Sequence, residues 1–385
     1  MINEDMKKKA LFVANTGFAL FNHRLQLMRL LSNAGWSVVA IANDESDYIH
    51  KFSKMGIKFI NVNIDHKGMN PLTDAAIVWR LKSIYKHESP VLVHHFTIKP
   101  VIFGSLAAKW AKVPVIINSI TGLGYAFYKG GFLMHTVMML YKLALSGRPQ
   151  VIFQNNDDCR LFISNNIVKK TKAKIILGSG IDTKTIYPNT KKRCDNAIQF
   201  LLVSRMLWSK GINEYVHAAE KVKKQFPGTR FIIAGGASGG GAKGNPDVIP
   251  EKWLRNFDAK GIIQWVGRIP MENVMTLLDN SDVIVLPSYY PEGVPRSLIE
   301  AAAKGKPIIT TNTPGCKDVV VDGLNGFLMP PKNVELLANC MIKFIQDPGL
   351  IERMGLESRK RAIDLFDAEK ILDKTVKVYK EAGAA

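Results

Sequence analysis

Two glutamates eight positions apart, Glu292 and Glu300, have the side chains and spacing best suited to chemistry in this chain. An apolar run, Val283–Leu286, precedes them and predicts a buried strand. Pro295 favours a helix start, and Ala301–Ala303 favour a helix interior. We therefore expect Glu292 in a strand-to-helix loop and Glu300 about one turn into the helix. Because exposed amides at a helix start bind anions, this segment suits a ligand with phosphates flanked by hydroxyls, such as a nucleotide-sugar.

Basic residues precede these glutamates in a similar strand-and-turn context. Arg205 and Lys210 follow the apolar run Phe200–Val203, so they are placed to meet the same phosphates. The alternative is structural, because glutamates at this spacing are common in helices. Arg205 could also pair with a surface carboxylate, and Lys210 could cap a helix.

The length and charge of the chain limit which classes of function are possible. The 385 residues exceed one ordinary core, so two domains are expected. Residues 1–190 hold 24 Lys and Arg against 11 Asp and Glu, a net charge of +13 out of +19. This basic half predicts an anionic partner: a membrane surface, a diphosphate or nucleic acid. Nucleic acid is disfavoured because no zinc spacing, helix-turn-helix pattern or aromatic RNA-binding motif occurs.

The compartment is expected to be the cytoplasm. Four widely spaced cysteines without a Cys-x-x-Cys pair are typical of reduced structural residues. The first apolar run, Ala10–Ala14, is too short for a signal peptide core. Uninterrupted apolar segments of about 18 residues are missing, so we expect no transmembrane helix.

Strand-like and helix-like runs alternate along the chain, break in a linker at residues 178–196, and then restart. This alternation predicts two doubly wound parallel sheets, whose ligands bind beyond the carboxyl ends of the strands, in a cleft between domains. The expected strands are Ala10–Asn15, Ser37–Ala42, Lys58–Val62, Val91–His94, Val115–Asn118, Val151–Gln154, Ile175–Leu177, Phe200–Val203, Arg230–Ala234, Ile262–Val266, Val283–Leu286 and Pro307–Thr310. The expected helices are Phe21–Asn33, Tyr48–Met55, Thr73–His87, Val101–Ala111, Phe132–Leu145, Asn213–Lys224, Glu272–Leu278, Arg296–Ala303, Val334–Gln346, Leu350–Phe366 and Ala368–Tyr379.

One segment, residues 235–246, is rich in glycine but lacks the Gly-Lys-Ser/Thr of a P-loop. Its first glycines are expected to let backbone approach a ligand, and the remainder to form a loop.

Together these motifs resemble family 4 of the retaining glycosyltransferases, which have the GT-B fold of two Rossmann-like domains facing across a cleft. The resemblance spans nearly the whole chain and rests on Arg205, Lys210, Glu292-Gly293, Glu300, and the turns Gly305-Lys-Pro307 and Asp322–Gly326. It implies an N-terminal acceptor-side domain at 1–185, completed by a C-terminal helix at 368–385, and a nucleotide-sugar-binding domain at 186–367. Residues 105–114 and 122–124 are similar to bacterial O-antigen, capsule and lipid-linked-oligosaccharide enzymes that add N-acetylgalactosamine to undecaprenyl-diphosphate acceptors.

The resemblance implies a role for each matched residue. Arg205 and Lys210 would hold the donor diphosphate and neutralise the leaving group, and Glu292 would bind the donor sugar; these three form the catalytic set. Glu300 would accept hydrogen bonds from the ribose. Backbone or flanking contacts to the donor would come from Gly17, Gly267, Arg268, Gly293, Val294, Pro295 and Arg296.

The N-terminal domain departs from the family pattern. Many members carry a histidine after the strand equivalent to Val115–Asn118, but this chain does not. Substitutes for the sugar or acceptor contact are His95, Lys99, Thr121 and Gly122, and a histidine that is merely packed is an equal alternative for His95.

An aromatic, apolar and basic stretch, Tyr125–Lys142, is expected to form a helix either in a membrane interface or buried against the sheet. The expected location is therefore cytoplasmic, peripherally associated with the inner face of the cytoplasmic membrane. Partners would be a nucleotide-sugar, a polyprenyl-diphosphate-linked acceptor and anionic lipid.

The resulting hypothesis is a hexosyltransferase that retains the anomeric configuration, uses a UDP-sugar as co-substrate, and needs no cofactor or metal. N-acetylgalactosamine is the favoured sugar, in bacterial surface glycan or glycoprotein biosynthesis. The alternatives are a nucleotide-sugar 2-epimerase of the same architecture and a non-catalytic nucleotide-sugar-binding scaffold. A dehydrogenase is disfavoured because no Gly-x-Gly-x-x-Gly follows the first strand.

Overall fold

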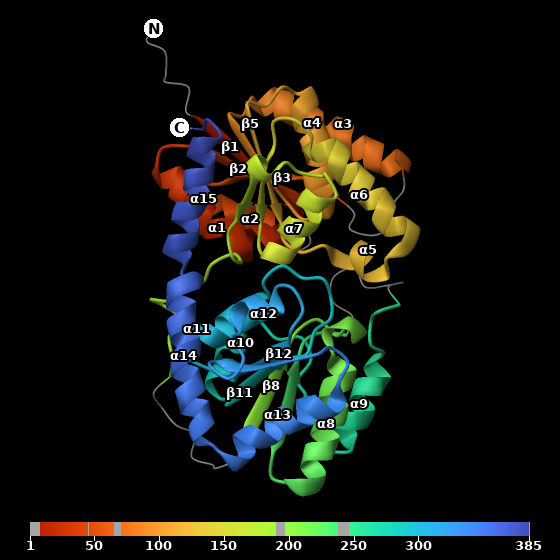
Figure 1. Cartoon of the computed structure of the whole chain (residues 1–385). Helices are drawn as coiled ribbons and strands as arrows, with labels where there is room; N and C mark the ends of the chain where they lie inside the picture. The colour runs from red at the N-terminus through yellow and green to blue at the C-terminus, as the bar shows by residue number, and fades with distance from the viewer. Residues whose placement is uncertain (1–7, 45, 65–70, 190–196, 238–245, 385) are drawn as a thin grey trace. The chain divides into compact units, whose positions relative to one another are not determined.

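The computed structural model describes residues 8–44, 46–64, 71–189, 197–237 and 246–384 (Figure 1). The chain folds into two compact units. Unit 1 comprises residues up to Ser179 together with Glu369–Ala385, and unit 2 comprises Gly180–Ala368.

Unit 1 is built on a parallel sheet in which seven described strands follow the order β3-β2-β1-β4-β5-β6-β7. Its strands are β1 (Lys9–Thr16), β2 (Ser37–Asn43), β3 (Lys58–Asn61), β4 (Leu92–Phe96), β5 (Val115–Ile120), β6 (Gln150–Phe153) and β7 (Ala173–Ile175). Its helices are α1 (Gly17–Asn33), α2 (Tyr48–Ser53), α3 (Pro71–Glu88), the π-helical turn η1 (Pro100–Gly104), α4 (Ser105–Trp110), α5 (Gly124–Lys129), α6 (Gly131–Leu145), α7 (Asn156–Ser164), the 3-10 turn η2 (Lys170–Lys172) and α15 (Ala368–Glu381).

Helices cover both faces of this sheet because its strands are apolar on both sides (Figure 1). In β1, Leu11 and Val13 join the core cluster under α3, α4 and α6, while Ala10 and Phe12 join a second cluster under α1 and α15. The two-residue period of a strand thus feeds two cores from one continuous apolar run.

Unit 2 contains a second parallel sheet, with described strands in the order β10-β9-β8-β11-β12-β13. Its strands are β8 (Gln199–Val203), β9 (Arg230–Ala234), β10 (Gln264–Trp265), β11 (Val283–Leu286), β12 (Ile308–Thr311) and β13 (Gly326–Met329). Its helices are the 3-10 turn η3 (Trp208–Lys210), α8 (Ile212–Gln225), α9 (Glu251–Ala259), α10 (Met271–Asp279), α11 (Arg296–Ala303), α12 (Cys316–Val319), α13 (Val334–Gln346) and α14 (Gly349–Leu365). The expected fold class of two doubly wound parallel sheets is confirmed.

The units divide a few residues before the expected boundary at 185. The Ile181 amide donates to the Phe366 carbonyl, and the Arg359 guanidinium donates to the carbonyls of Thr183 and Ile186. These bonds hold the start of the expected linker against the end of α14, so residues 180–185 pack within unit 2. The rest of that linker, residues 190–196, lies outside the described residues.

Several elements were missed or divided differently by the sequence prediction. Helices α7, α9 and α12 and strand β13 were not expected, and the helix expected over Tyr125–Lys142 is divided into α5 and α6. The expected helix Val101–Ala111 is a π-helical turn followed by α4. Gly130 lies between α5 and α6, and Gly131 begins α6; both are at positive φ, a backbone conformation that other residues rarely adopt.

Within the part of the chain that the structure describes, no helix is both long enough and apolar enough to cross a bilayer.

Candidate active site

The candidate residues of unit 2 meet at the topological switch point of its sheet. From β8 the chain continues to its neighbour β9, whereas the neighbour on the other side, β11, opens the second half of the sheet. In such sheets a crevice forms at the carboxyl ends of the two strands where the order reverses. Arg205 and Lys210 follow β8, and Glu292 follows β11, so the sequence-predicted catalytic set lies at this point.

The loops after β8 and β11 are joined directly. The Tyr289 amide donates to the Ser209 carbonyl over 2.8 Å. Gly211 has a φ of +75°, and a Cβ there would lie 2.2 Å from the Pro287 carbonyl oxygen. Only glycine therefore allows the β8 loop to approach the β11 loop this closely.

A substitution of Gly211 should unfold this junction. Gly211→Ala adds a clash with backbone to the strain of a left-handed residue, so we expect a loss of more than about 3 kcal/mol of unfolding free energy. Gly261→Ala is the matched control, because Gly261 has a φ of +66° and open space around it. The control should lose only about 1–2 kcal/mol. Denaturant unfolding measures both, and equal losses would refute the close approach.

Two cations and one carboxylate form the centre of the site. Lys210 is ion-paired with Glu292, and their side chains are 7 % and 17 % exposed. Burial lowers the pKa of Lys210, an effect that the adjacent Glu292 carboxylate opposes. The Arg205 guanidinium and the Lys210 ammonium lie 5.8 and 5.3 Å from the ring centroid of Tyr290. Lys210 is buried, whereas Arg205 is exposed. A second anion entering this cluster would therefore meet one cation shielded from water, where charge interactions are strong, and one at the surface.

Tyr290 was not predicted from the sequence as a site residue. Burial raises the pKa of its hydroxyl, so the ring stays neutral and can lie against both cations. Nothing in its local sequence distinguishes it from Tyr289, which instead contacts Lys332. Only the meeting of the β8 and β11 loops identifies it.

Hydrogen bonds involving Ser288 and Thr313 fix the loop that carries Glu292. The Ser288 hydroxyl donates to Glu292 Oε1 over 3.0 Å, and the Thr313 hydroxyl donates to the Ser288 carbonyl over 3.1 Å. Gly315, at a φ of +82°, packs against the Gly293 carbonyl so tightly that a Cβ would lie 1.6 Å from that oxygen. The loop after β12 therefore supports the backbone of Glu292-Gly293.

Glu300 lies on α11 beside the same loop. Its side chain is 4 % exposed and accepts a 2.7 Å hydrogen bond from Arg296 Nε, one helical turn earlier. Burial raises the pKa of Glu300, which the Arg296 charge opposes. Gly293, Val294 and Pro295 are buried between the two carboxylates. Because Pro295 has no N–H, the first amide that α11 offers is that of Arg296.

Two further loops border the site. The Gly235 amide, after β9, donates to the Gly267 carbonyl over 2.8 Å, and a Cβ on Gly236 would lie 3.2 Å from Arg268 Cβ. Gly267 is at a φ of +69°, and Arg268 is exposed. The first glycines of the glycine-rich segment thus serve the loop–loop contact, while residues 238–245 of that segment lie outside the described residues.

His95 is corrected from a candidate sugar contact to a core residue. It is fully buried, with Nε2 bonded to the Tyr85 hydroxyl at 3.1 Å and Nδ1 to Asn118 Oδ1 at 3.0 Å. Burial lowers its pKa to about 3. A Cβ on Gly104 would strike the ring, so the histidine is packed on that side as well. The packed alternative accounts for this residue.

The expectation for Lys99 is also not supported. Its ammonium lies 2.7 Å from Asp74 Oδ1, and the two side chains are 12 % and 8 % exposed. A lysine neutralised inside the fold is poorly suited to hold an acceptor diphosphate.

Gly17, Thr121 and Gly122 lie at the carboxyl edge of the unit 1 sheet, after β1 and β5. Gly17 is buried at the start of α1, and a Cβ there would overlap the Tyr48 ring, so packing alone requires a glycine. Thr121 and Gly122 are partly exposed in the turn after β5. Of the candidates in unit 1, these last two remain available to a ligand.

A strained residue at the same edge was missed by sequence reasoning. Thr97, after β4, has a φ of +69°, which is rare for a β-branched residue. Its hydroxyl donates to Oδ1 of Asn15, near the end of β1, over 2.9 Å. These strands are the switch point of unit 1, where β1 separates β2 from β4. The sequence gives no local signal for this strain.

The motif Asp322–Gly326 has a structural role in unit 2. Asn325 is buried, and its Oδ1 accepts from the Val321 amide over 2.7 Å. Asp322 Oδ1 accepts from the Leu328 amide over 2.8 Å. A Cβ on Gly326 would lie 1.9 Å from the Ile308 carbonyl oxygen. The motif therefore shapes the turn into β13 and does not line the switch point.

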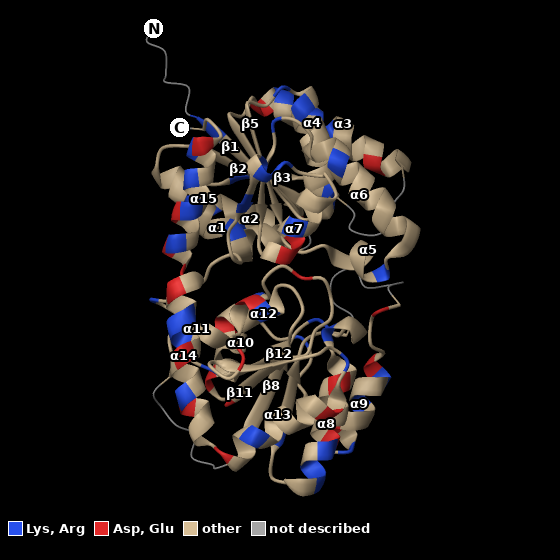
Figure 2. Cartoon of the chain, in the orientation of Figure 1, with Lys and Arg blue, Asp and Glu red and all other residues tan. Residues whose placement is uncertain are grey.

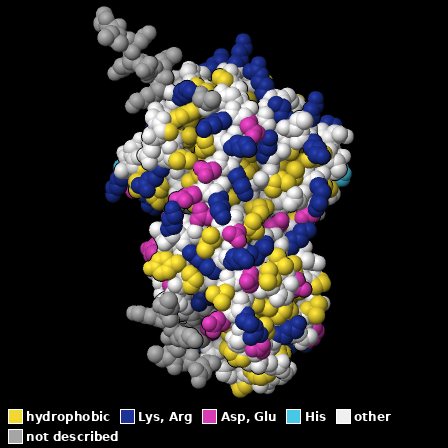
Figure 3. Space-filling view, turned by 60° about the vertical axis from the view of Figure 1, so that its left-hand side comes forward, with side chains coloured by type: hydrophobic (Ala, Val, Ile, Leu, Met, Phe, Trp, Pro, Cys, Tyr) yellow, Lys and Arg dark blue, Asp and Glu magenta, His cyan; other side chains and the backbone are white. Residues whose placement is uncertain are grey.

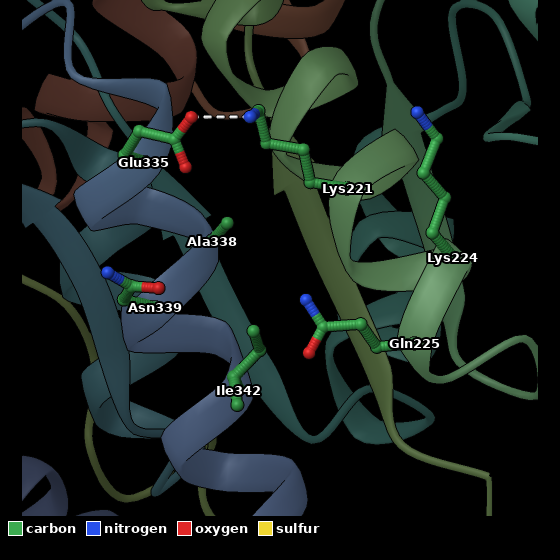
Figure 4. A pocket seen from close by; sticks show the side chains of 7 residues that line it. All are labelled: Lys221, Lys224, Gln225, Glu335, Ala338, Asn339 and Ile342. Atoms are coloured by element: carbon green, nitrogen blue, oxygen red, sulfur yellow. Dashed lines mark hydrogen bonds and ion pairs between the residues drawn. The ribbon is translucent and has the colours of Figure 1, made fainter.

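Outside the switch point, unit 2 has a shallow hollow between α8 and α13 (Figure 4). An ion pair between Lys221 and Glu335 closes one end of it. The hollow is lined by Lys221, Lys224, Gln225, Glu335, Ala338, Asn339 and Ile342.

Among the described residues, no group of three or more His, Cys, Asp or Glu side chains could hold a metal ion.

Two family models and several relatives match this chain. The family model "Glycosyl transferases group 1" matches residues 184–361, and "Glycosyl transferase 4-like" matches residues 9–155. The chain is 26 % identical over 383 residues to the N,N'-diacetylbacillosaminyl-diphospho-undecaprenol alpha-1,3-N-acetylgalactosaminyltransferase of Campylobacter jejuni, covering 96 % of this chain and 97 % of that protein. It is 24 % identical to the UDP-Gal:alpha-D-GlcNAc-diphosphoundecaprenol alpha-1,3-galactosyltransferase of Escherichia coli, covering 92 % of each.

Solved structures show the same fold. The Anabaena protein HepE in complex with UDP-glucose superposes with a TM-score of 0.78 at 17 % identity, covering 97 % of this chain and 99 % of that one. A glycosyltransferase from Rickettsia africae superposes with a TM-score of 0.77 at 21 % identity, covering 97 % and 98 %. The two family models together match residues in both units. The chain therefore belongs to the GT-B glycosyltransferases, with an N-terminal domain of the "Glycosyl transferase 4-like" type and a C-terminal domain of the "Glycosyl transferases group 1" type.

Proposed function

We propose that this glycosyltransferase moves a sugar from a UDP-sugar to a polyprenyl-diphosphate-linked saccharide, with retention of the anomeric configuration. The observation that carries the proposal is the cluster at the unit 2 switch point: Arg205, Lys210 and Glu292 beside the start of α11, with Glu300 one turn further on. Cations for a diphosphate and carboxylates for hydroxyl groups stand next to each other there.

Each residue has a defined task in this proposal. Lys210 and Arg205 bind the diphosphate and neutralise the charge that grows on departing UDP, which stabilises the transition state. Glu292 accepts hydrogen bonds from the donor sugar, and Glu300 accepts them from the ribose. The Arg296 amide and the Gly293-Val294 backbone complete the donor contacts, while Gly267 and Arg268 flank the base.

The ion pair with Glu292 neutralises the buried Lys210 ammonium, which would be costly without a partner. When a diphosphate binds, the ammonium exchanges the carboxylate for phosphate oxygens. Glu292 is then released toward the sugar hydroxyls. The acceptor hydroxyl attacks the anomeric carbon on the face from which UDP departs, and its proton passes to the departing diphosphate. The configuration is thereby retained, and no protein base is required.

The acceptor class comes from the relatives. The names of both the C. jejuni and the E. coli proteins specify saccharides on an undecaprenyl carrier. The first of these adds N-acetylgalactosamine, so an N-acetylhexosamine is the favoured donor sugar, in the assembly of bacterial surface glycan or glycoprotein. The protein would work at the inner face of the cytoplasmic membrane, where such carriers are presented.

A panel of UDP-sugars with a polyprenyl-diphosphate-linked saccharide tests the proposal, with released UDP and lipid product both measured. We expect transfer from one UDP-N-acetylhexosamine in excess chelator, because Arg205 and Lys210 supply the positive charge that a metal ion supplies elsewhere. The matched comparison repeats the reaction with added magnesium or manganese. Activity that appears only with the metal contradicts the metal-free chemistry. UDP binding without transfer to any acceptor would instead indicate a nucleotide-sugar-binding scaffold.

A further inference from the structure

An apolar surface on unit 1 has no role in the donor site. Three helices that lie side by side, α3, α4 and α6, form it (Figure 1). We call it the α3–α4–α6 face. Its large exposed side chains are Leu72, Trp79, Trp110, Phe132, Met139 and Leu143.

The face is continuous across the three helices. The rings of Trp79 on α3 and Trp110 on α4 are 5.9 Å apart. Lys109 Nζ on α4 donates to the Leu143 carbonyl on α6 over 2.9 Å. Helix α4 therefore contacts both α3 and α6.

Helix α6 has two apolar sides. Val137 and Tyr141 are buried in the core, while Phe132 and Met139 are 88 % and 73 % exposed. A helix that only packs against a sheet presents polar residues to water. The buried side of α6 fits the expectation of a helix packed against the sheet, and the outward side needs another explanation.

The charges around this face are of one sign. Residues 71–148 contain nine Lys and Arg but only two acidic residues, Asp74 and Glu88. Both acidic side chains are buried, Asp74 paired with Lys99 and Glu88 with Lys9 and Lys58. Figure 2 shows the basic positions along α3, α4 and α6. By contrast, the side of the molecule that carries α15, turned forward in Figure 3, mixes acidic and basic side chains between small apolar patches.

One lysine connects the aromatic and basic components. Lys82 Nζ lies 4.3 Å from the Trp79 ring centroid and 5.6 Å from that of Trp110. Tryptophan and lysine together are typical of the interface between lipid headgroups and acyl chains, where the ring is half-immersed and the ammonium meets phosphate.

We propose that the α3–α4–α6 face docks this protein on an anionic lipid bilayer, with Phe132, Met139, Trp79 and Trp110 entering the headgroup region. The uniform positive charge favours a bilayer over a second copy of this chain, whose identical face would repel it. The biological purpose of this docking rests on the proposed lipid-linked acceptor, whereas the test of vesicle binding does not. Docking here would place unit 1 where such an acceptor is presented.

The test is binding of the full chain to vesicles. The probe is phosphatidylcholine with about one-third phosphatidylglycerol, compared with phosphatidylcholine alone, by co-sedimentation. The double variant Phe132→Ser, Met139→Ser should bind the anionic vesicles at least about tenfold more weakly, since two side chains no longer leave water. Leu356→Ser is the control, because Leu356 on α14 is 67 % exposed but belongs to unit 2. Wild type should bind less at high salt.

A charge-reversal pair examines the electrostatic part. Lys129→Glu with Lys142→Glu should weaken vesicle binding, and should lower transfer to a lipid-embedded acceptor more than transfer to a short-chain soluble one. Lys224→Glu with Lys252→Glu, exposed in unit 2, gives the same change in net charge and should do neither.

Two outcomes overturn the proposal. One is unchanged vesicle binding by the Phe132 and Met139 variant, and the other is a dimer in sedimentation velocity that this variant dissociates, which would assign the face to a protein contact. Failure of the proposed function is distinct, because it would appear as absence of transfer to both acceptors by a protein that still binds vesicles.

Discussion

Lys210→Ala should reduce turnover about a hundredfold or more, because the ammonium that neutralises the departing diphosphate is lost. A positioned cation of this kind contributes about 3 kcal/mol to lowering the barrier. The effect should fall on kcat more than on KM for the donor, since charge on the leaving group is greatest in the transition state. Steady-state kinetics with saturating acceptor measures both.

Loss of Lys210 also leaves Glu292 without its cation, so stability must be measured alongside activity. Lys304→Ala is the matched control. Lys304 is 12 % exposed and paired with Asp279 at 2.8 Å, but it follows the last residue of α11, at the end away from the switch point. Both variants should lose some unfolding free energy, and only Lys210→Ala should lose turnover. Near-normal turnover in Lys210→Ala would remove Lys210 from the phosphate site.

Glu300→Ala should weaken the binding of UDP alone by about tenfold to a hundredfold. A buried carboxylate that accepts hydrogen bonds is worth about 1.5–3 kcal/mol, and its removal also leaves Arg296 unpaired. Titration calorimetry with UDP gives the dissociation constants. Glu300→Gln keeps the shape and one acceptor oxygen, so its loss should be smaller.

The ribose assignment has its own control in the ligand. Wild-type protein should bind UDP more tightly than at least one of the two analogues 2′-deoxy-UDP and 3′-deoxy-UDP, because that analogue lacks a hydroxyl that is bonded to Glu300. Glu300→Ala should bind all three about equally. A variant that discriminates as strongly as wild type would show that Glu300 holds α11 through Arg296 and does not contact the ribose.

The sequence by itself was sufficient for the fold class. Alternating apolar runs and helical patterns predicted two parallel sheets, since each element is defined by local periodicity. Strands β9 and β11 and helices α11 and α13 were predicted with their observed bounds. Short elements such as α9 and β13 were missed, because their patterns are weaker than the tertiary contacts that hold them.

The sequence also singled out Arg205, Lys210, Glu292 and Glu300, because each follows a predicted strand at a spacing that puts polar side chains at the carboxyl edge. That they meet was decided by the order of strands in the sheet, which places β8 beside β11 although more than 70 residues separate them in the chain. The ion pair of Lys210 with Glu292 and the position of Tyr290 follow from that pairing, and no local pattern encodes it.

The tertiary structure alone decided which polar and apolar residues are accessible. His95 and Lys99 looked available to a ligand, but Tyr85, Asn118 and Asp74, distant in sequence, take up their hydrogen-bonding groups. Conversely, Phe132 and Met139 look like core residues, yet α6 turns them outward. The periodicity of the sequence shows on which face of its helix a side chain lies. Its burial depends on which element covers that face, and this is fixed by contacts between elements far apart in the chain.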